Sequence, residues 1–289
     1  MNQRNIFFRK IYALLEKFQL KYKASSVSYI RFGTGSRTAF CFHGYGEDAV
    51  SFSFLEKYAG AEYTFFAIDL PFHGHTLWNE GYTCSITDIE QIIGQIMISN
   101  GREPGTGTNK LTLLGYSLGA RVALALYEKM SPRTDRLVLL APDGLKVNFW
   151  YWLSTQTGIG NKLFAFTMKH PSWFFGFLKG LNKLRLVNAS IFKFVNYYIG
   201  DKEVRTLLYA RWTTLRKLKP NIDRIKKEIN EHKTKVRLVY GMHDRIILST
   251  VGEKFRKGIG EHCIISVIRS GHQVLHEKHA TDLLPALLQ

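Results

Sequence analysis

The fold of this chain is decided by one stretch, Leu111-Thr112-Leu113-Leu114-Gly115-Tyr116-Ser117-Leu118-Gly119. Its apolar first half predicts a buried strand, and the residues that follow it, up to Met130, predict a helix. A sharp turn between the two crowds the backbone around Ser117. Gly115 and Gly119 fit there because glycine has no Cβ to clash with the neighbouring elements. We therefore expect the Ser117 hydroxyl to stand above the sheet, at the N-terminus of the new helix.

The Gly-x-Ser-x-Gly pattern also occurs by chance, in which case the serine is an ordinary helix N-cap. A catalytic serine needs a base, and the base needs an acid that fixes its tautomer, because an unassisted hydroxyl is a poor nucleophile. Both follow downstream: the strand predicted at 235–240 leads to Asp244, and the strand predicted at 262–268 leads to His272. Each lies just beyond a strand, where an open parallel sheet presents its ligands.

Besides the serine, the base and the acid, such a catalytic site needs an oxyanion hole, because fixed N–H donors must stabilise the negative charge of a tetrahedral intermediate. The strand predicted at 37–42 runs into His43-Gly44-Tyr45-Gly46, whose glycines permit a tight loop above the sheet. The backbone N–H groups of Tyr45 and Leu118 are the two candidate donors. His43 is interpreted as a residue that braces this loop by hydrogen bonds, since His272 already fills the role of base.

Together these motifs resemble the α/β-hydrolase superfamily, over nearly the whole chain. The resemblance implies a mostly parallel central sheet flanked by helices, a helical cap insertion, and Ser117 as nucleophile with His272 as base and Asp244 as acid. The chain departs from the family pattern at Phe72, where many relatives have glycine. The matching residues are His43–Gly46, Asp69–His75, Gly115–Gly119, Gly241–Asp244 and Gly271-His272 with Leu275-His276-Glu277.

Two further acids compete with Asp244. Asp143 follows the strand predicted at 135–141, and some relatives carry the acid at that point. Asp244 is preferred because a Gly-x-x-Asp pattern after the next strand is the commoner position. Asp69 ends the apolar strand predicted at 63–68 and is interpreted as a turn residue that hydrogen-bonds its own loop.

The domain organisation follows from the alternation of apolar and amphipathic segments, which indicates a parallel sheet covered on both faces. The alternation stops between 144 and 220, a segment too long for an ordinary connection, and we predict a helical cap there. The core is then 25–143 with 221–289. Besides the strands already given, one is expected at 27–32 and one at 110–115, and helices are expected at 86–100, 118–130, 221–231, 249–258 and 273–287.

The predicted cap is rich in aromatic residues, some of which should form the roof of a pocket over Ser117. An apolar roof favours a substrate with an acyl or aromatic portion. The rings are Phe149, Trp150, Tyr151, Trp152, Phe164, Phe166, Trp173, Phe174, Phe175 and Phe177. We assign substrate contacts to His43, Phe72, Tyr116 and Trp150.

Charge is unevenly distributed. Residues 146–235 carry 18 Lys and Arg against 5 Asp and Glu, and so contribute 13 of the net charge of +17. This excess indicates an anionic substrate, an anionic membrane surface, or a solvated basic face without a specific partner. No nucleic-acid partner is expected, because no nucleic-acid-binding motif is present. The oligomeric state is left open.

The N-terminal residues 1–24 predict a basic amphipathic helix, with Phe7, Ile11 and Leu14 on its apolar face. Such a helix contacts a membrane interface, packs on the body of the protein, or pairs with a second chain. Three cysteines and the absence of a cleavable signal favour the cytoplasm, with peripheral membrane contact as an addition. No cofactor is expected, because the chain has no metal-site spacing, Walker loop or dinucleotide fingerprint.

The sequence thus predicts a serine hydrolase that cleaves a carboxylic ester or thioester through an acyl-enzyme on Ser117. Two alternatives stay open. The same three residues serve carbon–carbon bond hydrolases or lyases in some relatives, where Arg211 or Arg216 would hold a substrate carboxylate. A non-catalytic small-molecule-binding protein on this fold is the other.

Overall fold

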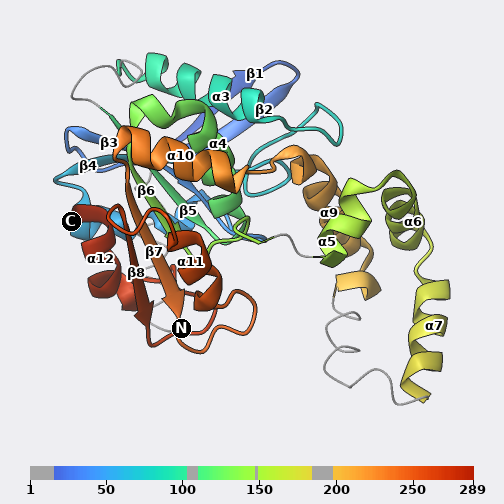
Figure 1. Cartoon of the computed structure of the whole chain (residues 1–289). Coiled ribbons are helices and arrows are strands. Elements are labelled where there is room, and N and C mark those ends of the chain that lie inside the picture. Colours follow the sequence, from blue (N-terminus) through green and yellow to red (C-terminus); the bar gives the residue numbers. More distant parts are fainter. Residues whose placement is uncertain (1–15, 103–109, 147–148, 184–197) are drawn as a thin grey trace, which may run out of the picture. The chain divides into compact units, whose positions relative to one another are not determined.

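An eight-stranded sheet forms the centre of the larger of two compact units (Figure 1). The computed structural model describes residues 16–102, 110–146, 149–183 and 198–289. The strand order across the sheet is β1-β2-β4-β3-β5-β6-β7-β8. In chain order the strands are β1 (Glu16–Tyr22), β2 (Ser25–Phe32), β3 (Arg37–Phe42), β4 (Tyr63–Ile68), β5 (Leu111–Tyr116), β6 (Thr134–Leu140), β7 (Lys235–Gly241) and β8 (Cys263–Ile268).

The sheet is antiparallel at one edge and parallel elsewhere. β2 pairs antiparallel with both β1 and β4, and every pairing from β4 through β3, β5, β6 and β7 to β8 is parallel. All of β4 and β5 is buried, as the continuous apolar runs of these strands require when both faces of a sheet are covered. The expected mostly parallel sheet flanked by helices is confirmed.

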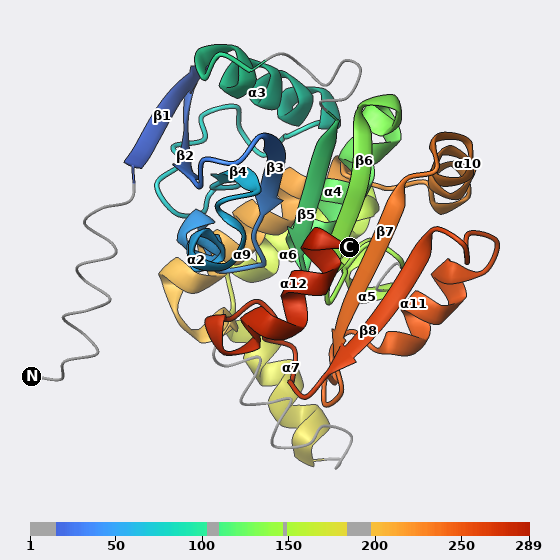
Figure 2. The ribbon, with the colours of Figure 1, turned by 90° about the vertical axis from the view of Figure 1, so that its left-hand side faces the viewer.

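Helices cover the two faces of the sheet (Figures 1 and 2). α4 packs on β3, β5 and β6 with α3 and α10 beside it, while α2 and α12 pack together and α12 contacts β7. α11 contacts β7 and β8. Their bounds are α2 (Leu55–Ala59), α3 (Ile86–Ser99), α4 (Leu118–Met130), α10 (Ile222–His232), α11 (Ser249–Arg256) and α12 (Ala280–Leu288), with 3-10 turns η1 (Ala49–Phe52), η2 (Ser131–Arg133) and η4 (Glu277–His279).

Glu80–Cys84 and Val147–Lys217 form a second compact unit. Its described helices are α5 (Phe149–Gln156), α6 (Gly158–Lys169), α7 (Ser172–Lys183) and α9 (Lys202–Thr214), followed by η3 (Leu215–Lys217). Aromatic side chains join these helices to one another: Trp212 contacts Tyr151 at 5.3 Å and Phe164 at 5.8 Å between ring centroids. The unit thus contains most of the segment expected as a cap, and its role as the roof of a pocket stays a prediction.

The prediction for the N-terminus is wrong from residue 16 onward, and residues 1–15 lie outside the described ranges. Glu16–Tyr22 form β1 instead of a helix. Phe18, Leu20 and Tyr22 also alternate along the chain, and pairing with β2 satisfies their backbone groups while Phe18 stacks on Tyr29 at 5.1 Å. Phe18 and Tyr22 also continue the helical spacing of the apolar residues before them, so the alternation typical of a strand was not recognised in the sequence.

The last helix is shorter than the predicted span of 273–287. Val274 and Leu275 are buried in an irregular segment, and α12 begins at Ala280. This segment keeps His272 in a loop, because the N–H of Val274 bonds back to the carbonyl of His272 at 2.8 Å. Within the described ranges, no helix is long and apolar enough to span a membrane.

Candidate active site

The backbone at Ser117 has the strained conformation that the motif predicts. Its φ is 50° and its ψ is −114°, a region that side-chain-bearing residues rarely adopt. The turn is held from both sides, since the Ser117 N–H donates to the carbonyl of Leu140 at 2.9 Å and the Ser117 carbonyl accepts from the Asp143 N–H at 3.1 Å. Ser117 is therefore half-buried between the end of β5 and the start of α4, with its hydroxyl fixed above the sheet.

Both glycines of the motif are required by close backbone contacts. A Cβ on Gly119 would lie 1.9 Å from the carbonyl oxygen of Phe42, and one on Gly115 would lie 2.5 Å from the Cα of Ala120. Real Cβ atoms do not approach other atoms so closely. The helix can thus pass tightly over β3 and β5 only because residues 115 and 119 lack side chains.

The structure brings Ser117, His272 and Asp244 together. Ser117 Oγ lies 3.0 Å from His272 Nε2, and His272 Nδ1 lies 2.8 Å from Asp244 Oδ2. An ionised carboxylate only accepts hydrogen bonds, so Asp244 requires the ring proton on Nδ1. Nε2 is then an acceptor that faces the serine hydroxyl.

Asp244 is held on its other side by backbone. Its Oδ1 accepts from the N–H groups of Ile246 at 2.7 Å and Ile247 at 3.0 Å, and its side chain is fully buried. The loops that carry Asp244 and His272 run against each other, because a Cβ on Gly241 would lie 1.9 Å from the carbonyl oxygen of Gly271. This contact sets the short distance between the two side chains.

The glycine-containing loop after β3 lies beside Ser117. A Cβ built on Gly44 would stand 2.8 Å from the ring of Tyr116 and 3.5 Å from the Cβ of Ser117. Tyr45 follows Gly44, so its backbone passes close to the nucleophile candidate. Leu118 is the first residue of α4, and its N–H is one of those that a helix leaves without an intrahelical partner. The two candidate oxyanion donors therefore belong to residues next in the chain to Gly44 and to Ser117, which lie close together.

His43 braces this loop, as interpreted from the sequence. Its Nε2 accepts from the backbone N–H of Leu70 at 3.0 Å, and its Nδ1 lies 2.8 Å from the carbonyl of Gly44. The side chain is completely buried, so the further assignment of His43 to substrate contact is wrong: it has no surface to offer. The loop after β4 and the loop after β3 are linked through this ring.

The other three residues assigned to substrate contact have different outcomes. Phe72 is half-buried at a φ of 63°, in the left-handed region that favours glycine, and its contact with substrate stays a prediction. Tyr116 is 2% exposed and packs beneath the site, with its ring centroid 5.7 Å from that of His272, so a direct contact with substrate is not supported. Trp150 lies in α5, and its side chain is outside the described part of the structure.

The two competing acids have other partners. Asp143 forms an ion pair with Arg121, whose side chain is 8% exposed. Asp69 accepts from the N–H groups of Ala49 at 2.7 Å and His75 at 2.9 Å, and so ties together the loops after β3 and β4. Its interpretation as a turn residue is confirmed.

Glu47 and Gln273 were missed by the sequence reasoning. Glu47 directly follows the loop His43–Gly46, and Gln273 directly follows His272. Gln273 Nε2 donates to Glu47 Oε1 at 2.6 Å. Their adjacency to two predicted site motifs was visible in the sequence, but the contact spans 226 positions and only the fold brings the pair together.

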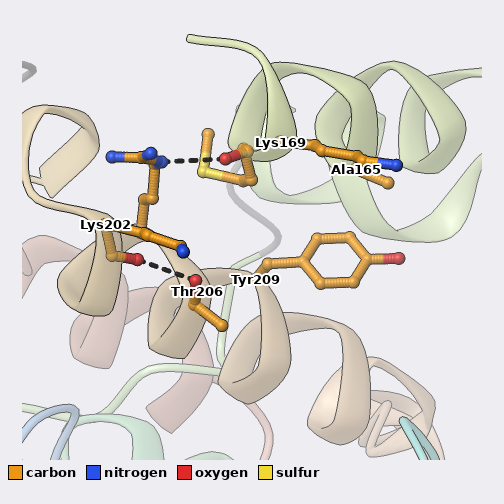
Figure 3. Close-up of a pocket in the computed structure, with 7 residues that line it drawn as sticks. Ala165, Lys169, Lys202, Thr206 and Tyr209 are labelled. Atoms are coloured by element: carbon orange, nitrogen blue, oxygen red, sulfur yellow. Dashed lines mark hydrogen bonds between the residues drawn. The ribbon is translucent and has the colours of Figure 1, made fainter.

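The second unit contains a pocket of about 240 Å³ between α6 and α9 (Figure 3). Lys169, Lys202 and Arg205 give it a basic lining, and Tyr209 adds an aromatic wall. Arg205 Nε donates to the carbonyl of Met168 at 2.9 Å, so this guanidinium also caps the last turn of α6. Among the described residues, no three His, Cys, Asp or Glu side chains are grouped as a metal site requires.

The sheet order, the strained serine turn and the hydrogen-bonded side chains define an α/β-hydrolase. More narrowly, the chain belongs to the serine aminopeptidase S33 family, whose sequence profile matches residues 36–279. A comparison with curated protein sequences finds no significant match.

Solved structures share this fold at low sequence identity. An esterase from Thermogutta terrifontis is 17% identical with a TM-score of 0.64, over 94% of this chain and 98% of that one. A serine hydrolase of carbazole degradation is 19% identical with a TM-score of 0.61, over 94% and 98%. The thioesterase domain of the curacin biosynthetic pathway is 14% identical with a TM-score of 0.60, over 94% and 99%.

Proposed function

We propose that this protein is a serine hydrolase that cleaves a carboxylic ester or thioester through an acyl-enzyme on Ser117. The observation that carries the proposal is the unbroken line of contacts from Ser117 Oγ through both ring nitrogens of His272 to the buried carboxylate of Asp244. An esterase and a thioesterase domain among the solved structures with this fold are in keeping with it.

In the proposed reaction, His272 Nε2 takes the Ser117 proton as Oγ attacks the carbonyl carbon of the substrate. The N–H groups of Tyr45 and Leu118 stabilise the oxyanion of the tetrahedral intermediate. His272 then gives the proton to the leaving alcohol or thiol. Water, activated by the same imidazole, attacks the acyl-enzyme and releases the carboxylic acid. Asp244 holds the tautomer of His272 and stabilises its charged form throughout.

The test is the Ser117→Ala variant. It should lose turnover of short p-nitrophenyl esters and covalent labelling by a fluorophosphonate, because both need the activated hydroxyl. Its circular dichroism spectrum should match that of the wild type. Ser99→Ala is the matched control, since Ser99 is an exposed serine near the end of α3. Retained turnover in Ser117→Ala would remove this residue from the mechanism.

Mass spectrometry distinguishes ester or thioester cleavage from carbon–carbon bond cleavage by the same three residues. Rapid quenching during ester or thioester turnover should trap an acyl group on the peptide that contains Ser117. Carbon–carbon bond cleavage with the serine as a proton shuttle would leave that peptide unmodified. Comparing acyl chain lengths, with oxygen and sulfur leaving groups, would then define the substrate class.

A further inference from the structure

Glu47 carries a buried carboxylate oxygen and directly follows the loop His43–Gly46. This loop contains the proposed oxyanion donor Tyr45 and is called the oxyanion loop below. Glu47 Oε1 accepts a hydrogen bond from Gln273 at 2.6 Å, while Oε2 is buried. Burial raises the pKa of Glu47 above the ordinary value, against the opposing effects of hydrogen bonds from Gln273, from the Gly44 backbone and from the Ser51 side chain. Removing a carboxylate oxygen from water is costly unless the group is hydrogen-bonded.

Gln273 joins Glu47 to the loop of the proposed base. Its side-chain Oε1 lies 3.2 Å from the hydroxyl of Tyr116, and the same hydroxyl lies 3.2 Å from the carbonyl oxygen of His272. The backbone carbonyl of Gln273 accepts from Ser270 Oγ at 3.0 Å, which closes the loop around His272. One glutamine side chain thus contacts both Glu47 and Tyr116.

Each member of this network adjoins one part of the site. Glu47 follows the loop with Tyr45, Tyr116 precedes Ser117, and Gln273 follows His272. A shift of Glu47 would therefore be passed to the oxyanion loop and to the imidazole together.

We propose that Glu47 is a positioning residue, which holds the oxyanion loop and the His272 loop at a set separation through Gln273 and Tyr116. The inference rests on the proposed function. A hydrogen bond to an ionised acceptor is shorter and stronger than one between neutral groups, which offsets the cost of burying one oxygen of this half-buried side chain. Glu47 does not touch the reacting atoms, so it acts through the residues it holds.

The Glu47→Ala variant removes the acceptor for Gln273. We expect kcat, and the rate of fluorophosphonate labelling, to fall on the order of tenfold, because a misplacement of about 1 Å can cost 10²-fold. KM should change little, since no substrate contact is lost. Glu56→Ala is the matched control: Glu56 is an exposed glutamate on α2, and its removal should leave both rates unchanged.

An exchange of the two side chains distinguishes positioning from packing. Gln273→Glu alone sets two carboxylates against each other at the 2.6 Å contact and should lower kcat as Glu47→Ala does. The double variant Glu47→Gln with Gln273→Glu restores one donor and one acceptor in reversed order, and the Tyr116 hydroxyl still meets an oxygen. The double variant should recover most of the rate lost in Gln273→Glu. Because Glu and Gln side chains have nearly the same volume, such a recovery would report the hydrogen bond and not the packing.

The outcomes are distinguishable. If wild-type protein does not react with the fluorophosphonate, the proposed function fails and the positioning role has nothing to act on. If the wild type reacts and Glu47→Ala reacts equally fast while folded, the positioning role is overturned and the hydrolase proposal stands. Failure of the exchange to recover the rate, in a protein with an unchanged melting temperature, would also overturn it.

Discussion

Replacing Asp244 by asparagine should reverse the hydrogen-bonding direction at His272. Oδ1 of Asp244 accepts two backbone N–H groups, from Ile246 and Ile247. An asparagine would keep its carbonyl oxygen there, because its NH₂ group cannot accept. The NH₂ group is then left facing His272 Nδ1 at the position that Oδ2 occupies, 2.8 Å away. Nδ1 must accept, so the ring proton moves to Nε2 and points at Ser117.

With its proton on Nε2, the imidazole cannot take the proton of the serine hydroxyl. The loss for such a carboxylate-to-amide change is about 10⁴-fold in kcat. At about 1.36 kcal/mol for each factor of ten, this is a rise in the activation free energy of about 5.4 kcal/mol. The assay is steady-state hydrolysis of a p-nitrophenyl ester at neutral pH. Folding should be nearly unchanged, because the two backbone hydrogen bonds persist.

The Asp143→Asn variant is the matched control, since Asp143 is the other acid that follows a strand near Ser117. Its carboxylate is paired with Arg121 and not with His272. We expect turnover close to that of the wild type. The reasoning would be refuted if Asp244→Asn kept turnover within tenfold of the wild type, or if Asp143→Asn caused the larger loss.

Two further predictions concern stability. Gly119→Ala should lower the free energy of unfolding in urea by about 3 kcal/mol, because its Cβ would meet the carbonyl oxygen of Phe42. Gly94→Ala, in the open face of α3, should raise the free energy of unfolding by up to about 1 kcal/mol. Equal effects of the two substitutions would contradict this packing. Burial acts to raise the pKa of Asp88, but hydrogen bonds led by that of Lys23 hold this pKa well below the ordinary value. The ionised carboxylate therefore stabilises the folded state above about pH 4. That contribution is lost as the pH falls toward the folded-state pKa. The difference in urea midpoint between wild type and Asp88→Asn should therefore be larger at pH 7 than at pH 3, and a difference independent of pH would contradict it.

The strands of the sheet could be predicted because their signals are local. The runs at 39–42, 63–68 and 111–116 are mostly apolar, as expected of strands buried on both faces. β1 was not predicted because two of its alternating residues, Phe18 and Tyr22, are four positions apart and so also fit a helical period. The pairing of β1 with β2 decides between the two, and pairing is not a property of the segment alone.

The sequence by itself determined the chemical inventory of the site: a serine in a glycine-bounded turn, and an acid and an imidazole after later strands. These were readable because the strain of the turn and the position beyond a strand are set by neighbouring residues. Only the tertiary structure decided which groups meet. It placed Asp244, and not Asp143, in contact with His272, buried the side chains of His43 and Tyr116, and joined Glu47 to Gln273. Contacts between residues far apart in the chain depend on the packing of the whole sheet, and the residues around each partner do not encode them.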